Sequence, residues 1–399
     1  MMMIYKIHDI CDLIAGFAFK SKDFGNYSDK VIKIADIQPP IVNMESTVGV
    51  DTRQYDINKL QKFIVAKGDY VLAMTGATIG KLGRITSDCK AYINQRVLTF
   101  RPNEQIVNKD YLYYSLCSNN FTKYILNHID SETAQPNISA GSVGGFEISL
   151  PSLGEQRRIV DILIAIDRKI EINKRINDNL EQQAQALYKS WFIDNYQTEW
   201  PEYSLDEVTL KITDGVHNTV IDTPNGEYYL LSCKNIKNRR LNMSSSDRRI
   251  DEGTFNKLRK RTMLSKGDIL LSSVGTIGEL MLLNDDPHNY EFQRSVAIIK
   301  PNPVYISSYY LYENLISQID KITNTAHGAV QQCIFLSDLK EYTINIADKA
   351  LISRYDIIVK PFFDEITKRE KEIAGLTSLR DSLLPKLMSG ELKINNLDC

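Results

Sequence analysis

The chain contains an internal repeat with a period of roughly 198 residues, and this repeat limits the possible folds more than any other feature. Residues Lys67–Ile85 read KGDYVLAMTGATIGKLGRI, and Lys266–Leu283 read KGDILLSSVGTIGELMLL. Solenoid repeats have periods of about 20–50 residues, so this longer spacing predicts two duplicated domains. Further landmarks keep the same order in both halves: Gln95-Arg96 and Gln293-Arg294, Pro102-Asn103 and Pro301-Asn302, Tyr111–Leu116 and Tyr310–Leu315, Thr133-Ala134 and Thr325-Ala326.

Each copy combines strand and helix signals. The segment after each Lys-Gly-Asp is short, rich in Val, Ile and Leu, and bounded by glycines, which predicts a buried strand entering a tight turn. The segments YLYYSL and YLYENL predict the beginnings of short helices. We therefore expect two mixed α/β globules of about 150 residues each, an α+β fold overall. The predicted turn glycines are Gly76, Gly80, Gly275 and Gly278.

Each globule is followed by a stretch typical of a long helix. Apolar residues recur at alternating steps of three and four, a spacing that forms a seam buried against another helix. The first seam comprises Leu163, Ile166, Ile170, Asn173, Asn177, Leu180, Ala184, Leu187 and Trp191, and the second comprises Val359, Phe362, Ile366, Arg369, Ile373, Leu376, Arg380, Leu383 and Leu387.

We expect these two helices to pack on each other in antiparallel orientation, which would place the globules at opposite ends of a coiled-coil spacer with pseudo-two-fold symmetry. Asn173 and Arg369 occupy matched seam positions, where a polar residue tends to fix register. The alternative is that each helix lies on its own globule. Gly375 and Pro385 predict that the second helix kinks or stops near Leu384.

Charge and cysteine patterns narrow the possible functions. The net charge is only −2, but Lys234–Arg261 holds ten Lys and Arg against three acidic residues, as phosphate binding requires. The alternative is a solvated loop face. The six scattered cysteines predict neither structural zinc nor a disulfide framework. No apolar run is long enough to cross a membrane and no signal peptide is recognised, so we expect a cytoplasmic protein without metal or cofactor.

Two segments resemble a known family. Leu150–Tyr196 (LPSLGEQRRIVDILIAIDRKIEINKRINDNLEQQAQALYKSWFIDNY) resembles the central conserved region of the specificity subunits of type I restriction-modification systems. Leu376–Leu392 (LTSLRDSLLPKLMSGEL) is similar to the distal conserved region of the same subunits. The resemblance covers the whole chain in the order globule, helix, globule, helix.

The resemblance implies a DNA-recognition subunit without catalysis of its own. It implies that each globule is a target recognition domain, that the two read unlike halves of an asymmetric bipartite site in double-stranded DNA, and that the helices set the gap between the halves. It also implies that the helices dock two modification (methyltransferase) subunits, with restriction (motor-nuclease) subunits joining for cleavage. The implied boundaries are 1–150 and 197–350 for the recognition domains, and 151–196 and 351–399 for the helical spacers.

The duplication separates two classes of candidate DNA-binding residue. Features shared by both copies cannot explain why the copies read different bases, so Arg96 and Arg294 are expected to bind phosphate or pair with an internal acid. Divergent polar residues suit base edges or phosphates, although each could instead be a solvated loop residue. These candidates are Lys20, Lys22, Tyr27, Arg53, Gln54, Tyr55, Lys81, Arg84, Gln135 and Asn137 in the first copy, and His217, Asn218, Lys237, Asn238, Arg239, Arg240, His327, Gln331 and Gln332 in the second.

Two other functions remain as alternatives. A methyltransferase or nuclease would carry catalytic motifs, but Asp36–Ile41 lacks the aromatic residue of a methyltransferase loop, and Gly76–Lys81 lacks the spacing of a phosphate-binding loop. A scaffold would bind partner subunits through the helices, and its globules would bind protein rather than DNA. Salt-dependent binding to DNA would separate a DNA reader from a scaffold.

Overall fold

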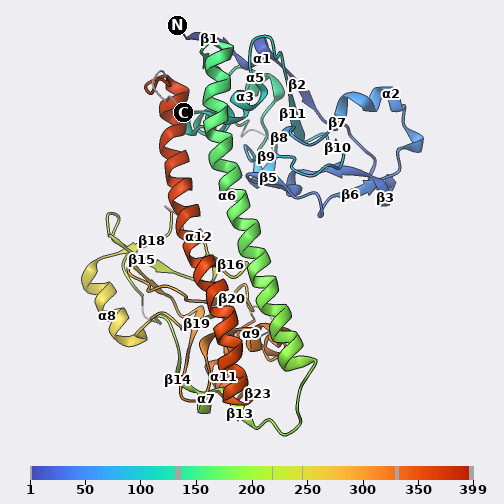
Figure 1. Cartoon of the computed structure of the whole chain (residues 1–399). Helices are drawn as coiled ribbons and strands as arrows, with labels where there is room; N and C mark the ends of the chain where they lie inside the picture. The colour runs from blue at the N-terminus through green and yellow to red at the C-terminus, as the bar shows by residue number, and fades with distance from the viewer. Residues whose placement is uncertain (1, 131–135, 218, 245, 329–331, 395–399) are drawn as a thin grey trace. The chain divides into compact units, whose positions relative to one another are not determined.

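The computed structural model describes residues 2–130, 136–217, 219–244, 246–328 and 332–394. The chain divides into two compact units (Figure 1): a first unit of Met1–Ile170 with Gly375–Cys399, and a second unit of Glu171–Ala374. Each unit therefore contains one copy of the repeat together with parts of both long helices.

The first unit is built on a six-stranded sheet in the order β2-β11-β8-β9-β5-β4 and a four-stranded sheet in the order β6-β3-β10-β7. β1 and β12 pair antiparallel with each other in a two-stranded sheet. Its strands are β1 (Met3–Lys6), β2 (Cys11–Ala15), β3 (Phe24–Ile32), β4 (Ile37–Gln38), β5 (Ile41–Val42), β6 (Val48–Val50), β7 (Ile64–Val65), β8 (Tyr70–Ala73), β9 (Leu82–Arg84), β10 (Ala91–Ile93), β11 (Val97–Pro102) and β12 (Glu147–Leu150). Its shorter helices are α1 (Ile7–Ile10), α2 (Ile57–Leu60), α3 (Lys109–Leu116), α4 (Asn119–Asn127) and α5 (Ala140–Gly144).

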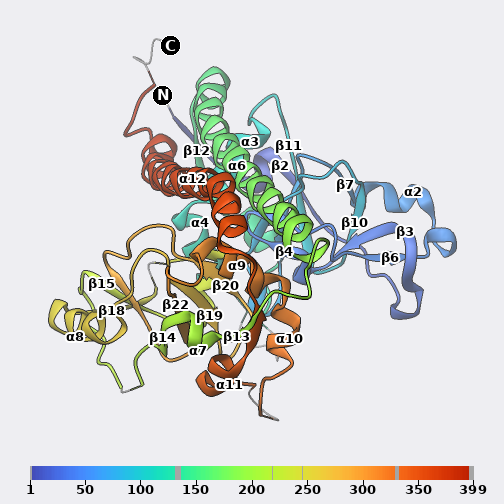
Figure 2. The ribbon, with the colours of Figure 1, turned by 60° about the horizontal axis from the view of Figure 1, so that its bottom comes forward.

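The second unit has a four-stranded sheet in the order β14-β22-β19-β20, a three-stranded sheet β18-β15-β21, and the pairs β13-β23 and β16-β17. Figure 2 shows α8 beside β15 and β18, where Phe255 and Leu258 pack on Leu230 and Ile250. Its strands are β13 (Glu202–Ser204), β14 (Thr209–Asp214), β15 (Tyr228–Leu231), β16 (Ile236–Lys237), β17 (Arg240–Leu241), β18 (Arg248–Ile250), β19 (Ile269–Ser272), β20 (Leu280–Leu282), β21 (Tyr290–Phe292), β22 (Val296–Pro301) and β23 (Thr343–Asn345). Its shorter helices are α7 (Leu205–Val208), α8 (Glu252–Thr262), α9 (Ser308–Ser317), α10 (Ile319–Thr323) and α11 (Leu336–Glu341).

The two units repeat the same topology. The order β2-β11-β8-β9 corresponds to β14-β22-β19-β20, and the parallel pair β3-β10 corresponds to β15-β21. The strands predicted after each Lys-Gly-Asp are β8 and β19, and the predicted short helices are α3 and α9. The four predicted turn glycines all have positive φ, from 70° to 92°. The predicted fold class, two mixed α/β globules with two long helices, is confirmed.

The long helices are α6 (Leu153–Tyr188), which continues as a short π-helical segment (Lys189–Ile193), and α12 (Lys349–Ser389). In the second unit they pack antiparallel, because the Tyr355 hydroxyl donates to the Ala184 carbonyl (3.2 Å) while Arg369 donates to Asn173 (2.8 Å). In the first unit the later part of α12 lies against the earlier part of α6, where Arg380 pairs with Asp167 (3.1 Å).

The helix α12 does not stop near Leu384, as Pro385 had suggested, but continues to Ser389. Proline removes one hydrogen bond from a helix interior. The final turns nevertheless bury apolar side chains in the core of the first unit: Leu387 is 1% exposed, and Leu383 and Met388 pack beside it. This burial offsets the lost hydrogen bond.

Candidate nucleic-acid interface

Several turns of the first unit meet at one edge of its larger sheet. The amide of Gly16, just after β2, donates to the carbonyl of Val97 (2.9 Å), and the amide of Met74, just after β8, donates to Arg96 (2.9 Å). The segment 136–138 joins them, since the amide of Ile138 donates to Met74 (2.9 Å). We call residues 16–19, 74–80, 94–97 and 136–138 the first turn cluster.

The second unit repeats this arrangement. The amide of Val216 donates to Phe292 (3.0 Å), that of Ser273 to Ser295 (2.9 Å), and that of Ile334 to Ser273 (2.9 Å). We call residues 215–217, 273–278, 293–296 and 332–334 the second turn cluster. Backbone hydrogen bonds hold both clusters together. Their side chains can therefore differ while the backbone arrangement stays the same.

Gly16 and Gly215 open the two clusters at a point where the backbones approach too closely for a side chain. A Cβ atom would lie 2.2 Å from the Ile93 carbonyl oxygen at Gly16, and 2.0 Å from the Phe292 carbonyl oxygen at Gly215. Sequence reasoning missed this pair, although both glycines follow a strand and are spaced by nearly one repeat.

The candidate residues of the first unit divide into exposed and internally bound groups. Asn137 is half-buried and forms an isolated β-bridge with Thr75, and Gln135 lies outside the described residues. The exposed candidates are Lys20, Lys22, Tyr27, Arg53, Gln54 and Lys81. Of these, Lys20, Lys22 and Lys81 lie in the turn cluster or within three residues of it.

Arg53 and Tyr55 are engaged by neighbouring acids. The Arg53 Nε and Nη2 atoms each donate to Asp51 at 2.8 Å, and these bonds lower the pKa of Asp51 to about 2. The Tyr55 hydroxyl donates to Asp23, and its ring packs on Phe17, with centroids 5.4 Å apart. Tyr55 therefore packs against Phe17 of the first turn cluster. The side chain of Arg53 remains 81% exposed.

Arg84 is held inside the first unit. Its Nη2 atom lies 2.8 Å from Asp110, and its guanidinium lies over the ring of Tyr113, 4.0 Å from the centroid. The absence of a basic counterpart in the second copy had made Arg84 a candidate for base contact. In the structure, Arg84 has partners within its own domain. Its contact with a DNA base stays a prediction.

The second turn cluster carries His217 at its edge. One ring nitrogen of His217 lies 2.7 Å from Asp214, which also pairs with Arg261 at 3.1 Å. His327 pairs with Asp338 (3.3 Å) and is 60% exposed. Gln332 is exposed, and Asn218 and Gln331 lie outside the described residues.

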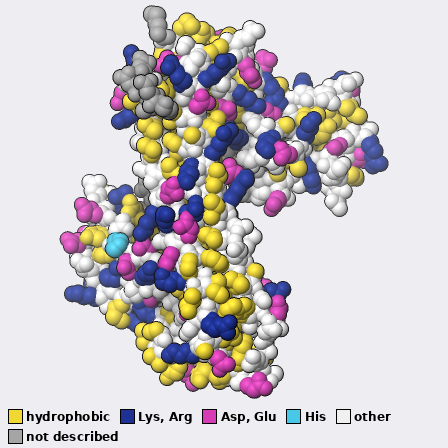
Figure 3. Space-filling view, in the orientation of Figure 1, with side chains coloured by type: hydrophobic (Ala, Val, Ile, Leu, Met, Phe, Trp, Pro, Cys, Tyr) yellow, Lys and Arg dark blue, Asp and Glu magenta, His cyan; other side chains and the backbone are white. Residues whose placement is uncertain are grey.

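The basic stretch Lys234–Arg261 forms internal ion pairs and hydrogen bonds rather than one free basic surface. On the face drawn in Figure 3, basic side chains of the second unit lie among acidic ones. Of the ten Lys and Arg residues in this stretch, three have no side-chain partner within the described residues: Lys237, Lys257 and Lys260. The paired residues are Lys234 with Asp247, Arg239 and Arg240 with Glu181, Arg248 with Asp222, Arg249 with Tyr229, Arg259 with Glu291, and Arg261 with Asp214.

Three acids, of which Glu291 and Glu313 are buried and Glu370 is half-buried, lie near these arginines. Burial raises the pKa of Glu291 despite its bond to Arg259, and burial raises the pKa of Glu370 beside Arg240. Burial also raises the pKa of Glu313 to about 8. Among the described residues, neither carboxylate oxygen of Glu313 has a hydrogen-bond partner.

The predicted seam residues all lie on buried or half-buried helix faces. The exposed fractions are 0% for Leu163, 7% for Ile170 and 5% for Ile366. Asn173, which is fully buried, accepts from Arg369 and donates to Glu372 (2.9 Å). The remaining predicted positions follow the same pattern: Ile166 and Leu387 are buried, and Leu180, Leu187, Trp191, Phe362, Ile373, Leu376 and Leu383 are half-buried.

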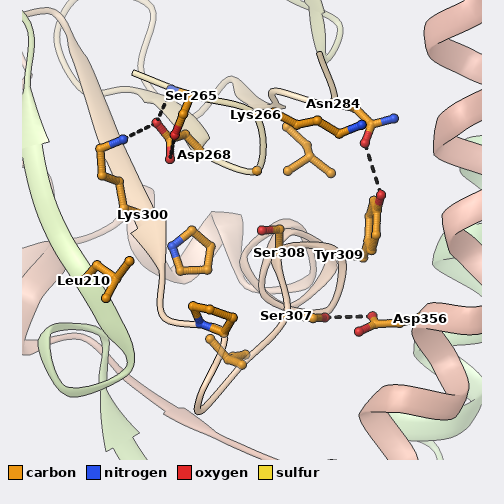
Figure 4. Close-up of a pocket in the computed structure, with 15 residues that line it drawn as sticks. Leu210, Ser265, Lys266, Asp268, Asn284, Lys300, Ser307, Ser308, Tyr309 and Asp356 are labelled. Atoms are coloured by element: carbon orange, nitrogen blue, oxygen red, sulfur yellow. Dashed lines mark hydrogen bonds and ion pairs between the residues drawn. The ribbon is translucent and has the colours of Figure 1, made fainter. Parts of the chain in front are cut away.

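A cavity of about 420 Å³ lies in the second unit, apart from the turn cluster (Figure 4). Its wall includes Asp268 of the repeated Lys-Gly-Asp, which pairs with Lys300 at 2.5 Å. In the first unit the corresponding Asp69 pairs with Arg101 (3.2 Å) and Lys109 (2.6 Å). Because both copies place a cation on this aspartate, the pair is a feature of the shared scaffold.

Comparison with known proteins supports the resemblance read from the sequence. Residues 1–182 match the family model described as the type I restriction modification DNA specificity domain. The chain is 26% identical to the type I restriction enzyme MjaIX specificity subunit of Methanocaldococcus jannaschii, over 76% of this chain and 73% of that protein. It is 24% identical to the EcoBI specificity subunit of Escherichia coli, over 96% of this chain and 84% of that protein.

A solved structure shares the fold. The S subunit of a type I restriction-modification system from M. genitalium aligns with a TM-score of 0.56 at 16% identity, covering 97% of this chain and 96% of that one. Within the part of the chain that the structure describes, no helix is long and apolar enough to span a membrane. The resemblance read from the two conserved segments is thus confirmed: residues 1–182 match the DNA specificity domain model, and the chain is similar to specificity subunits of type I restriction-modification systems.

Proposed function

We propose that this chain is the DNA-reading subunit of a restriction-modification complex and performs no catalysis itself. In this proposal, residues 1–150 and 197–350 are recognition domains that read unlike halves of an asymmetric bipartite site in double-stranded DNA. Residues 151–196 and 351–399 form the spacer that sets the gap between the halves. The spacer also docks two modification subunits, and restriction subunits join the assembly for cleavage.

One observation carries the proposal. The two turn clusters have the same backbone scaffold, while the side chains in and next to them differ: Lys81, directly after the glycine turn of the first cluster, corresponds to Glu279 in the second unit, and Ala18 of the first cluster corresponds to His217 of the second. A repeated scaffold with divergent side chains is what two readers of different sequences require, because base edges are read by side-chain donors and acceptors.

The duplicated arginines fit a role that both readers share. Arg96 and Arg294 lie in the same turn of the two clusters, one position apart because Arg294 occupies the position of Gln95, and both are exposed. An arginine at a fixed turn can contact the DNA backbone without discriminating between bases. We assign Arg96 and Arg294 to phosphate contact and the divergent residues of the clusters to base readout.

The salt dependence of DNA binding tests this proposal. The chain assembled with its modification subunits is titrated with duplex DNA at rising salt concentration. A DNA reader that neutralises several phosphates loses affinity along a straight line of log affinity against log salt, with a slope of about −0.9 per phosphate. Absence of binding to any duplex at low salt would support a protein scaffold instead.

A further inference from the structure

The hairpin β16–β17 is a tight turn in the second unit that presents two arginines. Asn238 and Arg239 occupy its central positions with φ of 51° and 62°. Two consecutive residues with positive φ are typical of a type I′ turn, in which Asn is common and Arg is not. Arginine is unfavourable in this backbone conformation. Favourable contacts of its side chain can offset that conformational cost.

The arginines reach both long helices. Arg240 forms ion pairs with Glu181 of α6 and with Glu370 of α12, its Nε lying 2.6 Å from the Glu370 carboxylate. Arg239 lies 4.0 Å from Glu181. The side chains of Arg240 and Glu181 are only 21% and 12% exposed. One guanidinium therefore bridges two helices, with its Glu181 partner largely buried and its Glu370 partner half-buried at 41% exposure.

The same hairpin also contacts Glu279, the residue directly after the second turn cluster. The amide of Asn238 donates to the Glu279 carboxylate (2.9 Å), and the amide of Glu279 donates to the Ser272 hydroxyl (2.8 Å). Glu279 directly follows Gly278, the last residue of the glycine turn. A continuous series of contacts thus runs from Glu181 and Glu370 through the hairpin to the end of the turn cluster.

The first unit lacks this ionic connection within its described residues. Its corresponding hairpin, β4–β5, has Pro39 and Pro40 at the turn and Ile41 where the second unit has Arg240. The Pro40 carbonyl there accepts hydrogen bonds from the Arg84 amide (2.9 Å) and the Tyr113 hydroxyl (3.5 Å). The arginine bridge is therefore specific to the second copy, not a requirement of the shared fold.

We propose that Arg240 is a positioning residue that fixes the second recognition domain on the helix pair and so restricts the gap between half-sites. This inference rests on the proposed function. It replaces the expectation that Arg239 and Arg240 contact DNA, because their charges are already matched by Glu181 and Glu370. Loss of the bridge leaves base readout intact and widens the range of gaps that the complex accepts.

The test measures modification by the complete complex on duplexes in which both half-sites are constant and the gap varies in single base-pair steps. For Arg240→Ala we expect the preference for the native gap over its neighbours to fall by about tenfold, with unchanged base preference in each half. Glu370→Gln keeps the shape of its side chain and removes the charge, so it should shift the gap profile in the same direction without the risk of unfolding.

Glu227→Gln is the matched control for Glu370→Gln, because Glu227 lies in the second unit outside the hairpin, is exposed and has no ion pair within the described residues. It should leave the gap profile unchanged. A wild-type gap profile for both Arg240→Ala and Glu370→Gln would overturn the inference, as would loss of a specific base in the second half-site for Arg240→Ala. If the unmodified complex itself ignores one half-site, the proposed function fails, and this outcome is distinct from the first two.

Discussion

Two glycines, Gly16 and Gly215, show how single positions hold the candidate DNA-binding edge together. Each lies directly after a strand and so close to the carbonyl group at the end of β10 (Ile93) or β21 (Phe292) that a Cβ atom is excluded. The repeat contains this information, because the two glycines are matched in the two copies. Neither alone is distinguishable from an ordinary loop glycine.

Gly215→Ala should destabilise the second unit. The added Cβ would lie 2.0 Å from the Phe292 oxygen, so the strand end must shift and the backbone bonds of the turn cluster must lengthen. We expect a loss of about 2–4 kcal/mol in the free energy of unfolding. Denaturant titration measures it. Gly154→Ala, where no atom lies within 4 Å of the added Cβ, is the control and should change stability little.

Glu313 predicts a pH-dependent stability. Burial raises its pKa to about 8, well above the value of an unfolded chain, so the folded protein binds the proton more tightly. The stabilisation is fully present below the unfolded pKa of roughly 4.3 and is lost as the pH rises through about 8. Glu313→Gln should remove this dependence and raise stability at pH 8 by roughly 1–3 kcal/mol, measured by denaturant titration at pH 6 and pH 8.

A pH dependence identical in wild type and Glu313→Gln would show that another group titrates. Glu207→Gln is a suitable control, because this exposed carboxylate has a lowered pKa, through bonds to Ser204, and titrates at acidic pH.

The arginines of the second copy mark the limit of sequence reasoning at this scale. Arg240 and Glu181 are 59 positions apart in the sequence. Many opposite charges at that separation do not pair, and the local sequence pattern does not indicate that these two do. A run of basic residues therefore predicts positive charge correctly but not whether that charge is already neutralised. Only the fold brings Glu181, Glu291 and Glu370 to these arginines.

At the scale of elements, the long helices were predictable because their pattern is sustained. Three-four spacing over many turns predicts a seam, and Leu163, Ala184 and Val359 are fully buried. The end of α12 was not predictable, because Pro385 signals a stop that tertiary burial of Leu387 outweighs.

The buried polar contact of the seam is open to direct test. Asn173→Leu removes the acceptor for Arg369 and the donor to Glu372, leaving a largely buried guanidinium with one partner fewer. We expect the free energy of unfolding to fall by about 1–3 kcal/mol. Lys174→Leu, at the next and exposed position of the same helix, controls for helix propensity and should be nearly neutral. Equal stability of both variants would show that the Asn173 contact contributes nothing.

At the scale of the whole molecule, the duplication was the most informative feature of the sequence. It predicts two domains, their shared turns and a division between shared and specific residues. It does not predict which loop residues point outward. Tyr55 donates a hydrogen bond to Asp23 and Arg84 pairs with Asp110, although both are residue types that suit contacts with DNA.

The spacer role predicts a geometric effect of helix length. Removing seven residues from α6 and the matching seven from α12 shortens each helix by about 10 Å while keeping the seam in phase. Mapping the modified site should then show a gap shorter by about three base pairs and both half-sites unchanged, since one base pair rises about 3.4 Å. An unchanged gap would mean that the helices do not set the spacing.

The most direct test of the central claim is to map modified bases across the genome in cells with and without this gene. Two unlike recognition domains on one chain predict a single asymmetric motif of two different short sequences separated by a fixed gap, modified only when the gene is present. A modification pattern that is the same in both cells, or a motif with one continuous or two identical halves, would contradict the account.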